Sequence, residues 1–367
     1  MFSLVFWQDA DIDHIHVFPA SDIPTSTPSD LPRQPSDTTL EAFGELDLKN
    51  YLLDQPFAAS KSLKTHEELD QFLTETETTV FLVVKDGVLV HEWYAGGIDP
   101  NALHTSFSVS KSILSTTIGM AVQDGFIGSL EDPITDYVPE LVERDSRFSD
   151  ITLRHLITMT SGLKYVEDSS PFEDAINTYH ATDLRRSAIR NTVIIEEPGK
   201  NYLYNNYNPL LLGMALERAT GMTVSKYISE TWWAPMGAEA DASWSMDSFY
   251  NRFEKMESGF NARPIDFARF GLMFANGGAV NGAQVIPQAW VEEATTATSS
   301  SIGQMDGLEQ SYGHFWWTYP DNRFAAQGNL GQYILVSPDE GEVIVRLGRD
   351  QTLVWPQLML DLLESLD

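Results

Sequence analysis

One serine and one lysine in this chain are spaced so that they could act as a nucleophile and its base. The tetrapeptide Ser108-Val109-Ser110-Lys111 precedes an apolar run, 112–122, that predicts a buried helix. If Ser108 begins that helix, one helical turn brings the Lys111 amine beside the serine hydroxyl. The backbone N–H of Ser108 would lie at the positive helix end, where an oxyanion can be stabilised. The pattern therefore predicts covalent catalysis by Ser108.

The same spacing occurs a second time, at Ser161-Gly162-Leu163-Lys164. This copy follows a short helical run, 153–158, and Gly162 predicts a helix end and a turn. No long apolar helix follows it, so we expect Lys164 to lie in solvent. Four-residue patterns also arise by chance, and context favours the first copy as the catalytic one.

A serine hydroxyl is a weak nucleophile until a base removes its proton. Lys111 can be that base if burial lowers its pKa, and a tyrosine phenolate beside an ammonium could share the role. The best candidate is Tyr204, in a polar aromatic loop before the apolar helical run 210–219. Tyr204 and Asn206 would project to the same side of an extended segment. Structural hydrogen bonds would explain that loop equally well.

A third polar segment, 325–331, leads into a predicted strand at Gln332 and contains Gly328-Asn329. Glycine at a strand edge allows a ligand to approach the backbone closely. The Asn329 N–H could therefore be a second oxyanion donor, although this segment taken alone fits a simple bulge or turn better.

Several aromatic side chains could line a substrate cleft, although each also fits core or surface packing. Tyr165 is the best candidate, because it comes just after the turn at 161–163. The others are Phe172, Tyr179, Trp316 and Trp317.

Composition excludes several classes of function. The 367 residues carry a net charge of −30, from 53 acidic and 23 basic residues, which disfavours binding to nucleic acid or anionic membranes. This surface is either solubilising or adapted to high salt. The chain has no cysteine, so thiolate chemistry and disulfides are excluded. His14 and His16 lack further ligands nearby, and we expect neither a metal nor a cofactor.

No run is long enough to span a membrane, and the apolar start of the chain lacks the basic residues of a signal peptide. We therefore expect a soluble protein, in the cytoplasm rather than the periplasm or the medium. The sequence leaves a monomer and a homodimer open. The expected partner is a small ester or amide substrate.

The pattern of elements is strands early, helices in the middle and strands late. Strands 80–84 and 88–94 flank the turn signal Asp86-Gly87, and strands 332–336 and 342–347 follow late in the chain. This order predicts an α+β fold with an antiparallel sheet built from both chain ends. We expect an α/β domain over 65–125 and 225–367, a helical domain over 126–224, and an N-terminal arm over 1–64 packed on the α/β domain.

Taken together, these motifs resemble the serine β-lactamase-like superfamily. Ser108-x-x-Lys111, Tyr204-x-Asn206 and the late Gly328 segment occur in its order and spacing. The chain looks like the branch of class C β-lactamases, family VIII carboxylesterases and 6-aminohexanoate-dimer hydrolases. The segments 151–163 and 207–213 also resemble sequences that flank the motifs of this superfamily. The resemblance covers roughly residues 65–350.

The resemblance implies a β-lactamase/transpeptidase-like fold and a role for each matching residue. Ser108 would be the acylated nucleophile, and Lys111 with Tyr204 would shuttle its proton. Asn206 would help to place the lysine and the substrate carbonyl. The backbone N–H groups of Ser108 and Asn329 would form the oxyanion hole.

One departure from the superfamily pattern bears on the substrate. Members that recognise penicillins carry Lys or His at the start of the late motif, where this chain has Ala326. Without that cation, anionic substrates should bind weakly unless another base such as Arg323 compensates. We therefore expect an ester hydrolase that extends to short linear amides. The alternatives are a 6-aminohexanoate-oligomer hydrolase, a weak β-lactamase, or a catalytically silent scaffold protein.

Overall fold

The computed structural model describes residues 15–18, 46–47, 62–63, 66–167, 173–298, 303–305, 308–349 and 353–364. Most of the predicted N-terminal arm, and Phe172, lie outside these residues. The strands are β1 (Ile15–Phe18), β2 (Leu46–Asp47), β3 (Ser62–Leu63), β4 (Thr78–Lys85), β5 (Val88–Tyr94), β6 (His104–Thr105), β7 (Ala242–Ser245), β8 (Phe260–Ala262), β9 (Ala279–Val280), β10 (Ala283–Gln284), β11 (Gly303–Met305), β12 (Leu308–Tyr312), β13 (Trp317–Thr318), β14 (Phe324–Gly328), β15 (Gln332–Ser337) and β16 (Glu342–Gly348).

The helices alternate with these strands and dominate the middle of the chain. They are α1 (His66–Glu75), α2 (Val109–Gln123), α3 (Ile134–Tyr137), α4 (Glu140–Arg144), α5 (Leu153–Ile157), α6 (Asp174–His180), α7 (Leu184–Asn191), α8 (Tyr207–Thr220), α9 (Val224–Ile228), α10 (Pro264–Ala275), α11 (Gln288–Ala294) and α12 (Trp355–Glu364). The 3-10 helix η2 (Ser146–Asp150) and the π-helical turn η3 (Ser229–Trp233) complete them.

The main sheet has eight strands in the order β11-β12-β13-β14-β15-β16-β4-β5, and every neighbouring pair is antiparallel. Its centre joins distant parts of the chain, because β16 pairs with β4 from Glu342 opposite Lys85 to Leu347 opposite Val80. The α+β class with an antiparallel sheet from both chain ends is thus confirmed. A second sheet, β1-β7-β8-β6, was not predicted, because its strands are too short to show a clear alternation.

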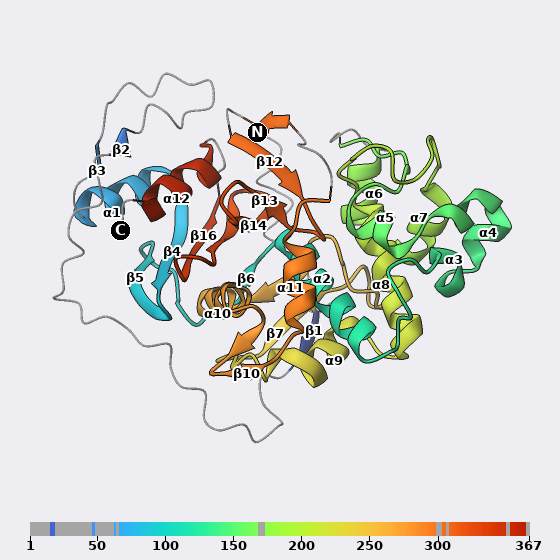
Figure 1. The fold of residues 1–367 in the computed structure, drawn as a ribbon, viewed down its shortest axis with the longest axis horizontal. Helices are drawn as coiled ribbons and strands as arrows, with labels where there is room; N and C mark the ends of the chain where they lie inside the picture. The colour runs from blue at the N-terminus through green and yellow to red at the C-terminus, as the bar shows by residue number, and fades with distance from the viewer. Residues whose placement is uncertain are drawn as a thin grey trace.

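Helices cover both faces of the main sheet (Figure 1). Alternate side chains of β4 divide between the faces, as the two-residue period of a strand requires. Phe81 and Val83 pack in one cluster with residues of α1 and α12, whereas Leu82 and Val84 join the larger core that includes α2 and α10. Helices α1 and α12 therefore lie together although they come from opposite ends of the chain.

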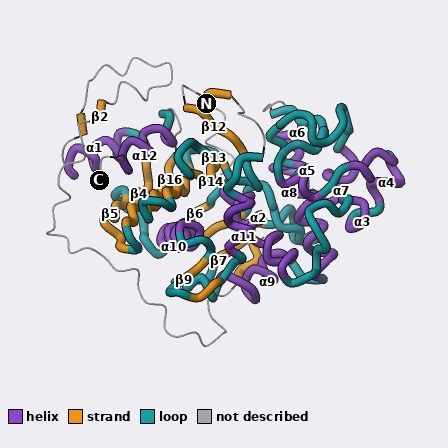
Figure 2. Tube along the Cα trace, in the orientation of Figure 1, coloured by secondary structure: helices purple, strands orange, loops and turns teal. Residues whose placement is uncertain are grey.

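The helices between α3 and α8 gather beside the sheet rather than on it, as the tube view shows (Figure 2). Helix α8 is central to this group, and it contacts α3, α5, α7 and α2. Helix α2 thus borders both the sheet, through β14, and the helical group. The exact domain limits at 126 and 224 remain a prediction. No helix among the described residues is long and apolar enough to cross a membrane.

Candidate active site

Helix α2 starts directly after Ser108 and is buried along almost its whole length, from Val109 to Ala121. Phe107, which precedes Ser108, has φ 47°, a left-handed conformation that is unfavourable for a non-glycine residue. The Ser110 hydroxyl donates to the Phe107 carbonyl at 2.6 Å and stabilises this turn. The turn places Ser108 at the N-terminus of a buried helix, as the sequence predicts.

Lys111 lies one turn further along α2, with 1% of its surface exposed. Its Nζ is 2.8 Å from the Ser108 Oγ and 2.9 Å from the backbone carbonyl oxygen of Glu257. The amine also lies over the Tyr204 ring, 4.8 Å from its centroid. Burial lowers the pKa of Lys111, although the nearby Tyr179, Glu257 and Glu167 oppose that shift. A lowered pKa favours the neutral amine, which can accept a proton.

Tyr204 reaches the same serine from the loop before α8. Its phenol hydrogen-bonds to Ser108, which partly opposes the strong rise that burial causes in the pKa of Tyr204. The ring stacks on Trp317 at a centroid distance of 6.0 Å and meets Tyr312 edge-on at 6.4 Å. The free protein therefore holds Tyr204 as a neutral phenol in a defined orientation next to the serine hydroxyl.

The opposite wall of the site is the end of β14. A Cβ atom on Gly328 would lie 2.3 Å from the Ser106 carbonyl oxygen and 3.2 Å from the Ser108 nitrogen, so only glycine fits there. Asn329 follows in the turn to β15, where its carbonyl accepts a hydrogen bond from the Gln332 amide at 3.1 Å. Buried Arg346 donates to the Gly331 carbonyl at 2.7 Å and braces the same turn. Because Gly328 has no side chain, the backbone of 328–329 lies directly against the backbone of 106–108.

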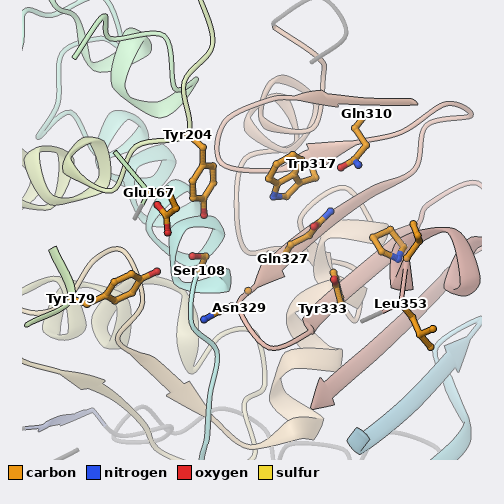
Figure 3. A pocket seen from close by; sticks show the side chains of 13 residues that line it. Ser108, Glu167, Tyr179, Tyr204, Gln310, Trp317, Gln327, Asn329, Tyr333 and Leu353 are labelled. Carbon is orange, nitrogen blue, oxygen red and sulfur yellow. The ribbon is translucent and has the colours of Figure 1, made fainter. Parts of the chain in front are cut away.

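A cavity of about 380 Å³ opens in front of Ser108. Figure 3 shows Tyr204 and Glu167 on one side of the serine, Tyr179 with its hydroxyl directed toward it, and the strand residues Gln327 and Tyr333 across the cavity. Among the described residues that line the cavity, Glu167 is the only charged one. The lining residues are Ser108, Glu167, Tyr179, Tyr204, Gln310, Trp317, Gln327, Gly328, Asn329, Tyr333, Leu353, Val354 and Pro356.

The serine, lysine and tyrosine thus meet at a cavity on an α+β frame, and comparison with known proteins identifies that frame. The family model described as Beta-lactamase matches residues 68–355. The chain belongs to the beta-lactamase family.

Relatives within and around this family include hydrolases of different substrates. The 6-aminohexanoate-dimer hydrolase of Paenarthrobacter ureafaciens is 29% identical over 311 residues, which cover 79% of this chain and 76% of the relative. A solved Bacillus anthracis protein, provisionally assigned as a 6-aminohexanoate-dimer hydrolase, has a TM-score of 0.76 at 22% identity and covers 96% of this chain and 90% of its own. EstCE1, a hydrolase with promiscuous acyltransferase activity, has a TM-score of 0.68 at 13% identity, covering 82% and 97%.

Asn206 of this beta-lactamase-family chain has contacts that differ from those expected. Its amide donates to the Tyr165 hydroxyl at 2.7 Å and to the Thr178 hydroxyl at 3.5 Å. Its carbonyl oxygen has no hydrogen-bond partner within the described residues. The hydrogen bonds of Asn206 therefore position Tyr165, and the expected contact with Lys111 is not among them.

The aromatic candidates divide between the cavity and the core. Tyr179 and Trp317 line the cavity. Tyr165 does not: it is 7% exposed, bonds to Thr178 at 3.2 Å and packs edge-on against Tyr207. Trp316 is fully buried and packs on Phe274, with 4.5 Å between ring centroids. Trp316 lies just before β13, and its packing on Phe274 keeps it in the core while Trp317 reaches the cavity.

Four polar residues near the site were missed by sequence reasoning. Glu167 follows Tyr165 by two residues, but an exposed glutamate in an acidic chain carries no signal of its own. Gln310 and Gln327 lie on separate strands that only the sheet brings together. Glu257 is a buried glutamate in a segment without a motif, and it is placed beside Lys111 only by long-range packing.

Proposed function

We propose that this protein is a serine hydrolase that cleaves carboxylic esters, and short linear amides as well, through an acyl-enzyme on Ser108. The observation that carries the proposal is the 2.8 Å contact between the Lys111 amine and the Ser108 hydroxyl. The lysine is buried, whereas the serine lines the cavity that a substrate could enter. Membership of a family of hydrolases supports the same reaction class.

Acylation follows from this geometry. With Lys111 neutral, the Ser108 hydroxyl donates its proton to the amine as the oxygen attacks the substrate carbonyl. The developing oxyanion is stabilised by the backbone N–H groups of Ser108 and Asn329, the first of them at the positive end of α2. The proton then passes from Lys111, with Tyr204 as the adjacent phenol, to the leaving oxygen or nitrogen. In deacylation a water attacks the acyl carbonyl and gives its proton to neutral Lys111; the bond from that carbonyl to the Ser108 Oγ breaks, the serine oxygen takes the proton back, and the acid leaves.

The cavity wall supports a preference against anionic substrates. Its polar side chains are amides, phenols, the Ser108 hydroxyl and the Trp317 indole, and Glu167 is the one charged residue among the described residues that line it. Ala326 is fully buried in β14, between the cavity residue Gln327 and the core residue Ala325, so no cation stands at the start of this motif. A substrate carboxylate would be desolvated there without a positive partner, which is costly. Neutral esters and amides, or those bearing an amine, suit the cavity better.

A second candidate is hydrolysis of 6-aminohexanoate oligomers. The Paenarthrobacter ureafaciens relative, with 29% identity over most of both chains, favours it, because its name describes cleavage of a linear amide dimer. Weak β-lactamase activity and a catalytically silent scaffold are the remaining alternatives. Soluble cytoplasmic localisation and adaptation to high salt also stay predictions.

Three substrates and one probe test the proposal. An aryl ester, the linear 6-aminohexanoate dimer and a chromogenic cephalosporin would be compared at low and at high salt. We expect turnover of the ester, slower turnover of the dimer, and little turnover of the cephalosporin. A fluorophosphonate should label the wild type at Ser108 and leave Ser108→Ala unlabelled. Folded wild-type protein that is neither labelled nor active on any of the three would overturn the hydrolase and favour the scaffold.

A further inference from the structure

Glu257 is a buried glutamate whose main chain contacts the lysine of the site. Its side chain is 0% exposed, and its carboxyl accepts a hydrogen bond from the Ser258 hydroxyl to Oε1 at 2.9 Å. The other oxygen, Oε2, has no hydrogen-bond partner among the residues that the structure describes. An ionised carboxylate with an unsatisfied oxygen in a buried position is strongly disfavoured. The site therefore favours a carboxyl that holds a proton.

The main chain of the same residue contacts the base. The Glu257 carbonyl oxygen lies 2.9 Å from the Lys111 Nζ, so the amine is held against the residue that carries this carboxyl. Four titratable groups face Glu257: Lys111 on α2, Lys255 on its own segment, Tyr179 on α6 and Tyr204 before α8. Lys255 also donates to the Tyr179 carbonyl at 3.1 Å. Lys111 is the buried lysine of this group, with 1% of its surface exposed.

We infer that Glu257 is a positioning residue whose buried carboxyl shares one proton with Lys111 and thereby decides when the lysine can act as a base. The inference rests on the proposed function of Ser108 and Lys111. The shared proton has two places. Either the carboxyl is protonated and the amine is neutral, or the carboxylate is ionised and the amine is an ammonium. Only the first arrangement leaves the amine able to take the serine proton.

Burial favours that first arrangement, since it raises the pKa of Glu257 and lowers the pKa of Lys111. Each time Glu257 is ionised, its charge stabilises the ammonium and withdraws the base from the reaction. Glu257 should therefore hold the acidic limb of the pH–rate profile at a higher pH than Lys111 alone would. The neutral isostere Glu257→Gln removes this competition and keeps an oxygen that can accept from Ser258.

The experiment compares pH profiles of kcat/KM for an aryl ester. We expect the acidic limb of Glu257→Gln to lie lower than that of the wild type by about half a pH unit or more, as expected for loss of one nearby charge. Ser258→Ala removes the donor to the carboxyl and so disfavours its ionised form. It should shift the limb in the same direction by a smaller amount, and it serves as the second variant if Glu257→Gln does not fold.

Glu254→Gln is the matched control. Glu254 is another glutamate with 0% exposure, three residues away, and its carboxyl accepts from the Ser225 backbone N–H at 3.1 Å instead of facing the base. We expect its substitution to lower stability and to leave the acidic limb in place. Unshifted limbs in folded Glu257→Gln and Ser258→Ala would overturn the inference. A wild type without Ser108-dependent hydrolysis at any pH would overturn the proposed function itself, and the inference with it.

Discussion

The chain contains the same four-residue pattern twice, and the two copies have opposite environments. Ser108 stands at the start of a buried helix, and the Lys111 amine lies 2.8 Å from its hydroxyl. Ser161 lies in a turn, where its hydroxyl donates to the Asn208 side chain at 2.8 Å. Lys164 is exposed, and its backbone N–H bonds to the Val193 carbonyl. The spacing alone therefore does not create a site.

Helical geometry is what separates the two copies. In the first copy, residues i and i+3 lie on one face of the helix that begins at Ser108, so the lysine side chain lies beside the serine. In the second, Gly162 has φ 72° and the chain turns away, so the serine and lysine side chains are directed apart. The first lysine also loses its water and gains a lowered pKa, whereas the second keeps its solvent. Burial and helix phase together turn a common pattern into a candidate base.

The largest expected effect comes from removing each serine in turn. Ser108→Ala should reduce kcat/KM for an aryl ester by at least about 10⁴-fold, because it deletes the nucleophile. Ser161→Ala should keep most of the activity and lower stability by about 1 kcal/mol, because it removes the buried hydrogen bond to the Asn208 side chain. Steady-state kinetics and thermal unfolding of both variants make the measurement. Equal activity in the two variants would contradict the assignment of Ser108, and not Ser161, as the nucleophile.

The two lysines give the next largest contrast. Lys111→Met, which fills the space without an amine, should cost about 10³-fold in kcat/KM, a usual contribution for general acid–base catalysis. The wild-type rate should rise with pH through the lowered pKa of Lys111, because only the neutral amine accepts a proton. That acidic limb should be missing from Lys111→Met.

Lys164→Met provides the control for the same chemical change at the second copy. Since Lys164 is exposed, its kcat/KM should stay within about twofold and its pH profile should keep the wild-type limb. A loss in Lys164→Met as large as that in Lys111→Met would mean that charge, not position beside the serine, matters.

Much of this contrast could be predicted from the sequence. What could not be predicted depends on contacts between residues far apart in the chain. The contact between Ser108 and Lys111 is local, so helix periodicity predicts it. The pairing of β16 with β4 follows in outline from strands at both chain ends, but its register depends on packing that no short pattern records. Glu257 and Gln327 reach the site only through long-range contacts. Tyr165 follows a predicted turn, yet burial beside Tyr207 directs it away from the cavity.

The end of β14 at Gly328 forms the wall opposite Ser108, and adding a single methyl group there should disturb it. In Gly328→Ala the added Cβ would lie 2.3 Å from the Ser106 carbonyl oxygen. Because that oxygen belongs to the backbone and cannot rotate away, β14 must move away from Ser108. We expect a loss of about 10²-fold in kcat with a smaller change in KM, because the oxyanion donors separate. Gly96→Ala is the control, since nothing lies within 4 Å of a Cβ there. An unchanged kcat in a folded Gly328→Ala protein would argue against an oxyanion hole at this point.

The smallest expected effect links the two regions, because the segment that carries the second copy continues to Glu167 at the cavity. Glu167→Gln removes the one charged lining residue. For a neutral ester KM should change by less than about twofold. For an ester bearing an ammonium group KM should rise about threefold at low salt and less at high salt, because the carboxylate is exposed and screened.

Glu143→Gln makes the same charge change on exposed α4, outside the residues that line the cavity, and corrects for the net charge of the whole surface. A rise in KM for the cationic ester in both variants would assign the preference to the overall charge of −30 rather than to Glu167. A rise confined to Glu167→Gln would show that the second segment serves the site through this carboxylate. Ser161 and Lys164 are not among the described residues that line the cavity, so the serine and lysine of this segment would have no part in binding the cationic ester.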